Sequence, residues 1–315
     1  MSDLFQFGSI KIPRRNIDAD TAFLIPKSSG YIPECEDIEE MLWGIQEQET
    51  KGEPWNTLIV GEPGCGKSAL VEWICAEMRI PLILIQGDGE QAVADLIGYH
   101  MYREAEGGMS WEDGKLPFSV RRKASILYDE INHVLPEVLS RTHSMLDYRR
   151  VLDLKENKVK RDVNGGIILV PEQLNVDPLS HFWATMNPHD TGRHVGTKPL
   201  SPALESRFNI RVRMGYLSDT NEVKLLTNKT SCGKKDAEKI VEVANKSREA
   251  FRNMEISMPI DHRMTMAWAA LVPQFGIKRA CKTTIINKLH EDDMDALRGL
   301  LISLGIEVAE GRGHE

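Results

Sequence analysis

A glycine-rich loop that ends in lysine and serine carries the clearest chemical signal in the sequence. Residues 61–68 follow the pattern G-x-x-x-x-G-K-S, between an apolar run at 57–60 and a helical segment at 69–78. Such a loop lets main-chain amides surround a phosphate group at a helix N-terminus. Lys67 would reach the β- and γ-phosphates, and the Ser68 hydroxyl would bind Mg²⁺, so ATP and Mg²⁺ are the predicted cofactors. The predicted cofactor-binding residues are Gly61, Glu62, Pro63, Gly64, Cys65, Gly66, Lys67, Ser68 and Ala69.

Two adjacent carboxylates form the second group of candidate catalytic residues. Asp129 and Glu130 end an apolar run at 125–128. Asp129 is expected to hold Mg²⁺ through water, together with Ser68, and Glu130 to act as the general base that polarises the attacking water. Neighbouring strand residues point to opposite faces, but the end of a strand relaxes this rule. Downstream of a phosphate-binding loop, the pair predicts a P-loop ATPase.

Two further side chains are candidates by position. Asn187 follows an apolar run at 182–185, where its amide can orient the lytic water opposite Glu130. Arg207 ends a short helix predicted within 200–208. By position alone, Arg207 is equally a surface charge or a finger that inserts into the nucleotide of a neighbouring subunit.

Short apolar runs that alternate with helical segments must position these residues. Most of the runs are apolar on both faces, as a parallel sheet covered by helices requires, and long crossovers between them indicate a doubly wound α/β domain. After residue 218 the strand pattern stops, and apolar residues recur at helical spacing in 235–251 and 293–304, with Gly305 as a stop signal. The predicted strands are 57–60, 82–85, 125–128, 182–185 and 210–212.

The composition restricts the class of protein. The 315 residues include 47 Asp and Glu against 39 Lys and Arg, a net charge of -8 that is poorly suited to coating a polyanion. No apolar run approaches the ~20 residues that span a bilayer, and no secretory signal is visible, so a cytoplasmic protein without membrane association is expected. The five cysteines form no C-x-x-C pair and fit reduced thiols. Cys65 is either a redox-sensitive thiol at a helix N-terminus or a small residue that fits the loop.

Six phrases of the sequence together carry a family resemblance: Gly61–Ser68, Asp95-Leu96-Ile97-Gly98, Asp129-Glu130-Ile131-Asn132, Ala184-Thr185-Met186-Asn187-Pro188, Leu200–Phe208 and Asp261–Ala269. They resemble the AAA+ superfamily and, within it, the MoxR-type ATPases, and are similar to the CbbQ/NorQ group and the cobaltochelatase ATPase subunit CobS. The resemblance implies a P-loop AAA+ core with a five-stranded parallel sheet and a smaller C-terminal helical lid. It divides the chain into an N-terminal extension at 1–55, a core at 56–216 and a lid at 217–315.

The resemblance also assigns roles to single residues. Asn187 corresponds to the sensor-1 residue, Arg207 to the finger that acts on the adjacent subunit, and Arg263 to the sensor-2 arginine that reaches the γ-phosphate from the lid. Asp261 is a candidate N-cap, which places Arg263 in the first helical turn, where the helix dipole disfavours a cation without an anionic partner. This chain has Asp261-His262 where the family has Ser-Pro before the arginine.

The function implied by the resemblance is ATP-driven remodelling or activation of a client protein. The chain would work as a homo-oligomer, a ring of six, with a partner that contains a von Willebrand factor A domain. Insertions at 99–115 and 153–178 would form hairpins that either contact the client or are solvated without a function.

Two alternative functions remain open. The first is a subunit of a metal (cobalt) chelatase, which shares every motif. A nucleic-acid-dependent motor is the second, supported only by the basic stretches Arg121-Arg122-Lys123 and Lys155–Arg161, and such runs are usually solvated faces.

Overall fold

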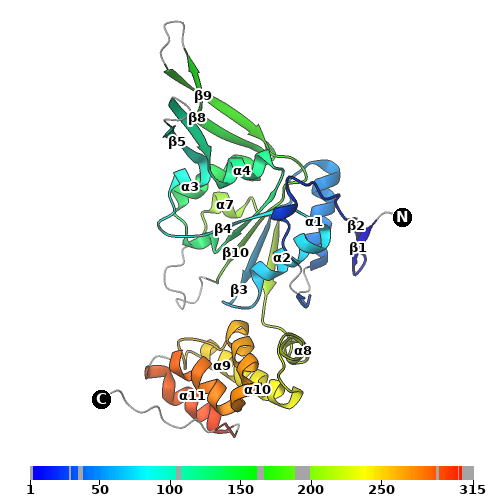
Figure 1. Cartoon of the computed structure of the whole chain (residues 1–315), viewed down its shortest axis with the longest axis vertical. Coiled ribbons are helices and arrows are strands. Elements are labelled where there is room, and N and C mark those ends of the chain that lie inside the picture. Colours follow the sequence, from blue (N-terminus) through cyan, green and yellow to red (C-terminus); the bar gives the residue numbers. More distant parts are fainter. Residues whose placement is uncertain are drawn as a thin grey trace. The chain divides into compact units, whose positions relative to one another are not determined.

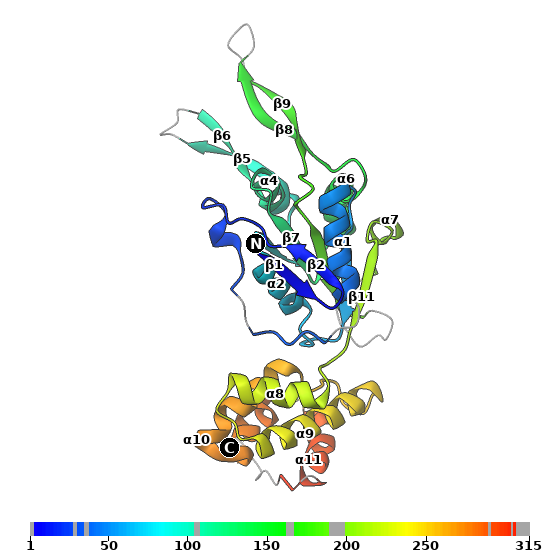
Figure 2. The ribbon, with the colours of Figure 1, turned by 90° about the vertical axis from the view of Figure 1, so that its right-hand side faces the viewer.

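The computed structural model describes residues 3–27, 30–34, 38–103, 108–161, 167–188, 199–288, 291–303 and 305–306. The chain divides into two compact units, one formed by residues 1–61 and 67–214 and the other by residues 62–66 and 215–315. Figure 1 and Figure 2 show the elements of each unit coloured along the sequence. Within the described ranges, no helix combines the length and the apolar character needed to cross a membrane.

A five-stranded parallel sheet in the order β11-β3-β10-β7-β4 forms the centre of the first unit. All five predicted strands are confirmed. Every residue of the central strand β10 is buried, which explains its continuous apolar sequence. Because β3, β7 and β10 are parallel neighbours, the residues that follow them meet at one edge of the sheet. The strands are β3 (Thr57–Gly61), β4 (Leu82–Gln86), β7 (Ser125–Asp129), β10 (Phe182–Met186) and β11 (Ile210–Met214).

Helices connect and cover these strands. In Figure 1, α1 and α2 lie to one side of the sheet and α3 and α4 to the other. The segment after Pro136 is divided into α5, a 3-10 turn at 140–142 and α6, and its apolar residues Val138, Leu139, Met145 and Leu146 are buried. The helices of this unit are α1 (Ile38–Lys51), α2 (Lys67–Met78), α3 (Val93–Ile97), α4 (Lys115–Arg121), α5 (Pro136–Leu139), α6 (His143–Leu146) and α7 (Pro202–Glu205).

Three antiparallel hairpins extend from the first unit. The predicted insertions at 99–115 and 153–178 form the hairpins β5–β6 and β8–β9, which lie next to each other at one end of the unit (Figure 1, Figure 2). The third hairpin, β1–β2, comes from the N-terminal segment and contacts α1. The hairpin strands are β1 (Leu4–Phe7), β2 (Ile10–Pro13), β5 (Gly98–Arg103), β6 (Gly108–Asp113), β8 (Val151–Arg161) and β9 (Ile167–Asn175).

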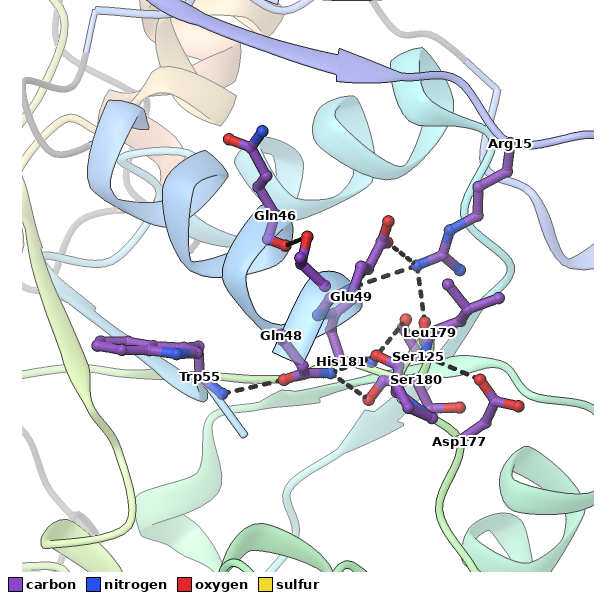
Figure 3. Close-up of polar contacts among 12 residues, drawn as sticks. Arg15, Gln46, Gln48, Glu49, Trp55, Ser125, Asp177, Leu179, Ser180 and His181 are labelled. Atoms are coloured by element: carbon purple, nitrogen blue, oxygen red, sulfur yellow. Dashed lines mark hydrogen bonds and ion pairs between the residues drawn. The ribbon is translucent and has the colours of Figure 1, made fainter. Parts of the chain in front are cut away.

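A buried polar network ties the N-terminal segment and α1 to the chain that leads into β10 (Figure 3). The imidazole of His181, only 2% exposed, lies 3.1 Å from a Glu49 oxygen through Nε2. Arg15 pairs with the same Glu49 oxygen and donates to a main-chain carbonyl within 178–180 at 2.7 Å. Gln48 Nε2 donates to two other carbonyls of that segment, at 2.8 and 2.9 Å. The position at which β10 begins is thereby fixed.

The second unit contains a bundle of helices. The predicted helices at 235–251 and 293–304 are confirmed as α9 and α11, and Gly305 has the positive φ, 72°, of a helix stop. A buried ion pair joins two helices, because Arg248 Nη1 and Nη2 donate to the two Glu222 oxygens at 2.7 and 2.9 Å. The helices are α8 (Asp219–Lys229), α9 (Lys234–Arg252), α10 (His262–Thr284) and α11 (Glu291–Ser303).

Candidate nucleotide-hydrolysis site

The main chain of the glycine-rich loop has the geometry of a phosphate cradle. Gly64 and Gly66 have φ values of +70° and +99°, in the left-handed region that favours glycine. Between them, the Cys65 N–H donates to the Glu62 carbonyl at 3.3 Å and closes a tight turn. The helix α2 begins at Lys67, directly after the loop, so successive amides precede a helix N-terminus. This arrangement suits an anion such as a phosphate group.

Lys67 and Asn187, 120 residues apart in the sequence, meet at the edge of the sheet. The Lys67 side chain is buried, and its Nζ donates to Asn187 Oδ1 at 2.9 Å and to the Gly61 carbonyl at 2.8 Å. The contact follows from the sheet order, because β3 precedes the loop and β10 ends just before Asn187. The two predicted residues are therefore brought together by adjacent parallel strands.

Oxygen atoms suited to Mg²⁺ gather beside this contact. Ser68 Oγ donates to Asp129 Oδ1 at 2.7 Å, and the Thr185 hydroxyl donates to the same carboxylate oxygen. Hydroxyl and carboxylate oxygens are hard ligands of the kind that Mg²⁺ prefers, and Mg²⁺ usually needs few protein ligands because phosphates and water complete its shell.

Glu130 has a left-handed backbone, with φ +54° and ψ +45°. This turn ends the alternation of the strand, so that consecutive carboxylates need not point to opposite faces. The Glu130 amide donates to Thr185 Oγ1 at 3.0 Å, which fixes the turn to β10. Gly87 allows the end of β4 to approach, because a Cβ atom there would lie 2.2 Å from the Glu130 carbonyl oxygen. The base predicted at position 130 is thus held by both neighbouring strands.

Thr185, Asn132 and Gly87 support the candidate catalytic residues, but none of them was predicted from the sequence. Thr185 and Asn132 lie inside phrases that carried the resemblance, but neither was given a role. Thr185 is fully buried, and Asn132, 1% exposed, donates to the Asn187 carbonyl at 3.4 Å. A buried hydroxyl in an otherwise apolar strand was the available signal for Thr185. Gly87 gives no such signal, because its role depends on which strands are neighbours.

Arg207 and Arg263 lie outside this group of contacts. Arg207 Nε donates to the His143 carbonyl at 3.2 Å, so the side chain is held by its surroundings rather than free on the surface. Arg263 belongs to the second unit, where it is exposed in the first turn of α10. The predicted N-cap of this helix is confirmed, since Asp261 Oδ1 accepts from the Met264 amide at 2.8 Å.

A phosphate-binding loop after one strand of a parallel sheet, with two carboxylates at the same edge of the sheet, defines the class of P-loop nucleoside triphosphatases. Residues 56–208 match the family profile of the AAA domain, dynein-related subfamily, and residues 222–303 match the CbbQ/NirQ/NorQ C-terminal domain. The chain therefore belongs to the MoxR-type AAA+ ATPases, of the CbbQ/NorQ/CobS type.

Individual relatives agree with this assignment. The chain is 26% identical over 248 residues to the aerobic cobaltochelatase subunit CobS of Sinorhizobium sp, covering 74% of this chain and 70% of CobS. It is 25% identical over 244 residues to protein NorQ of Paracoccus denitrificans, covering 77% of this chain and 83% of NorQ. Among solved structures, the RuvB Holliday junction branch migration motor of Thermotoga maritima shares the fold, with a TM-score of 0.50 and 16% identity over 90% of this chain and 74% of RuvB.

Proposed function

We propose that this chain forms a ring-shaped ATPase that uses ATP hydrolysis to remodel or activate a client protein. The proposal is carried by one observation at the edge of the sheet: Lys67 bonds to Asn187, Ser68 bonds to Asp129, and Thr185 holds both Asp129 and the Glu130 amide. Lys67, Ser68, Asp129, Glu130 and Asn187 are the residues that the sequence assigns to triphosphate binding and water activation.

Each of these residues has a defined task in the proposed reaction. Lys67 contacts the β- and γ-phosphates, and Ser68 and Asp129 hold Mg²⁺, which when bound offsets the phosphate charge. Glu130 accepts a proton from the attacking water, and Asn187 orients that water from the opposite side. The cradle amides of residues 62–66 bind the remaining phosphate oxygens.

The proposed ring supplies one further group to each site. Arg207 of one subunit would act on the ATP held by the next subunit, so neither neighbour alone completes the site. An arginine supplied in trans is worth on the order of 10³–10⁵ in rate. Arg263 would contact the γ-phosphate from the lid. Motion of the lid on phosphate release would then be transmitted to the client.

The client is proposed to be a protein, engaged together with a von Willebrand factor A domain partner. The β5–β6 hairpin offers a contact surface, since Tyr102 and Met109 face each other across its strands and are 68% and 46% exposed. A metal chelatase subunit is the second candidate, favoured by the similarity to CobS. Copurification of a large tetrapyrrole-binding subunit would favour the chelatase, whereas a small von Willebrand factor A protein alone would favour remodelling.

A nucleic-acid-dependent motor has less support. In the first basic stretch, Arg121 pairs with Asp113 at 2.8 Å and with Glu172 at 2.6 Å, and Lys123 pairs with Asp177 at 3.0 Å. These carboxylates neutralise Arg121 and Lys123, which would have to contact the phosphates of a nucleic acid. The similarity to RuvB concerns the fold alone.

The test of the proposed function is the Glu130→Gln variant, compared with Glu137→Gln on the exposed surface of α5. Glu130→Gln is expected to bind ATP and assemble normally, while turnover falls by about 10²–10⁴-fold because the general base is lost. Glu137→Gln, with the same chemical change, should hydrolyse ATP at the wild-type rate. Normal turnover by Glu130→Gln would refute the assignment of the base. Affinity purification of the stalled variant with ATP should retain the client.

A further inference from the structure

The guanidinium group of Arg207 has three contacts in the first unit, two on α6 and the residue after it and one on α7. Nε donates to the His143 carbonyl at 3.2 Å, Nη1 donates to the Ala203 carbonyl, and Nη2 lies 3.6 Å from Asp147 Oδ2. Each terminal nitrogen of a guanidinium carries two N–H groups, so each has a second one that these contacts do not use. The side chain remains 23% exposed, which leaves part of it accessible to another molecule.

A buried asparagine fixes the main chain on both sides of this contact. Asn56, only 1% exposed, donates from Nδ2 to the carbonyl of Leu146 at 2.7 Å and to the carbonyl of Arg207 at 2.8 Å. Leu146 directly precedes Asp147. The carboxylate and the guanidinium are therefore carried by segments that share one buried donor, and their separation is set by the fold.

The charge of Asp147 is already balanced by a different arginine. Arg149 donates to Asp147 through Nε at 3.1 Å and through Nη2 at 2.5 Å. These hydrogen bonds, with a smaller contribution from Arg207, hold the pKa of Asp147 below its usual value. Burial, assisted by Arg207, lowers the pKa of His143 and so favours its neutral form. Two guanidinium groups and one carboxylate leave one positive charge in surplus, and Arg149 makes the closer contact with the carboxylate.

We propose that Asp147 is a positioning residue that aims Arg207 at the ATP of the neighbouring subunit. The inference rests on the proposed function, because it gives Arg207 the role of the trans-acting arginine. Asp147 restricts the orientation of Arg207, while Arg149 satisfies the carboxylate, so the positive charge of Arg207 stays available to the γ-phosphate. Losing the carboxylate would let the Arg207 side chain occupy other rotamers, and a misplaced catalytic group costs on the order of 10²-fold in rate.

The inference is tested with Asp147→Asn, Asp147→Glu and the control Glu205→Gln. Glu205 pairs with Arg211 at 2.7 Å on an exposed part of the segment that carries Arg207, and such surface pairs contribute little. Asp147→Asn rings should bind ATP with wild-type affinity but turn over about 10–100-fold more slowly. Asp147→Glu should recover part of the rate, because it restores the carboxylate. Glu205→Gln should be as active as the wild type.

Mixed rings distinguish positioning of Arg207 from a role within the same subunit. Lys67→Ala subunits cannot use their own ATP site but still supply an intact Arg207 and Asp147. Adding them to Asp147→Asn subunits should restore turnover, as it should for Arg207→Ala subunits. Wild-type turnover by Asp147→Asn, or a low rate that mixing never restores, overturns the inference while leaving Glu130 and the ATPase assignment intact. Full activity of Arg207→Ala alone would instead remove the trans arginine from the proposed function, and the inference with it.

Discussion

Thr185 connects the Asp129 carboxylate to the main chain of Glu130 through one hydroxyl group. The hydroxyl donates to Asp129 and accepts from the Glu130 amide, so it uses both kinds of hydrogen bond that it can form. Thr185 is fully buried, so its hydroxyl holds both groups from inside the sheet. A buried residue of the neighbouring strand can therefore control where the general base lies.

We expect Thr185→Val, which keeps the shape of the side chain, to lower turnover by about 10–100-fold through misplacement of Glu130 and Asp129. ATP affinity should change much less, since Lys67 and the loop amides remain. Turnover and nucleotide binding are measured separately, at saturating Mg²⁺. Thr185→Ser keeps the hydroxyl and serves as the matched control, which should retain most of the activity. Equal turnover of the Val and Ser variants would contradict this role.

The site residues that could be predicted are those that lie within contiguous sequence motifs. Lys67, Ser68, Asp129 and Glu130 occupy positions whose spacing specifies their chemistry, and Asn187 ends a strand phrase. The supporting residues depend instead on which strands lie side by side. The spacing of residues in one sequence does not reveal that β10 lies between β3 and β7. The contacts that residues of β10 make with those two strands are therefore visible only in the structure.

At the scale of elements, the strands were predictable from the sequence, and one helical region has a detail that apolar spacing does not indicate. The strands needed only apolar runs of the right length. Between Pro136 and Leu146 the apolar spacing continues without interruption, but the helix tightens into a 3-10 turn at 140–142. Ser140 Oγ and Thr142 Oγ1 donate to the carbonyls three residues before them, at 2.6 and 2.7 Å. Such side-chain hydrogen bonds compete with the helical ladder and explain the turn.

The network before β10 predicts a dependence of stability on pH. Burial, with Arg15 beside it, lowers the pKa of His181 to about 4, against roughly 6.5 in an unfolded chain. Because the folded-state pKa is the lower one, the stabilising contribution is complete above about pH 6.5 and is lost as the pH falls toward 4. The free energy of unfolding should therefore decrease between about pH 6.5 and 5, where most carboxylates of the unfolded chain are still ionised.

This dependence is measured by urea unfolding at several pH values across that range. His181→Gln should be less stable than the wild type above pH 6.5, but should lose less stability on acidification. His133→Gln, which removes a histidine outside the network, should keep the acid sensitivity of the wild type. Parallel pH curves for the wild type and His181→Gln would show that His181 does not titrate in this way.

At the scale of the whole molecule, the chain contains only part of the proposed catalytic machinery for each ATP. The ATP-binding residues and Arg207 are both present in every subunit, but in the proposal they serve different nucleotides. The amino-acid sequence predicts both groups, the ATP-binding residues from their motifs and Arg207 from the family resemblance. It did not identify the client, because the surface that recognises a partner is set by shape and exposure rather than by a fixed spacing of residues.

We expect turnover per subunit to fall on dilution as rings dissociate, because a separated subunit lacks the arginine of its neighbour. The loss should approach the value of a trans arginine, on the order of 10³-fold or more. Rates and light scattering are measured over the same range of protein concentration. ATP binding by the separated subunits is the internal control and should persist. Constant turnover through the range in which scattering shows dissociation would contradict a shared site.

The backbone of Glu130 has a consequence for how this protein tolerates change. A residue other than glycine in the left-handed region costs about 1 kcal/mol or more, and Glu130 occupies that region in the folded chain. Glycine at this position would relieve the cost and remove the base at once. Laboratory selection for thermal stability alone would thus favour the inactive Glu130→Gly variant. Such a selection therefore needs an activity measurement in every round.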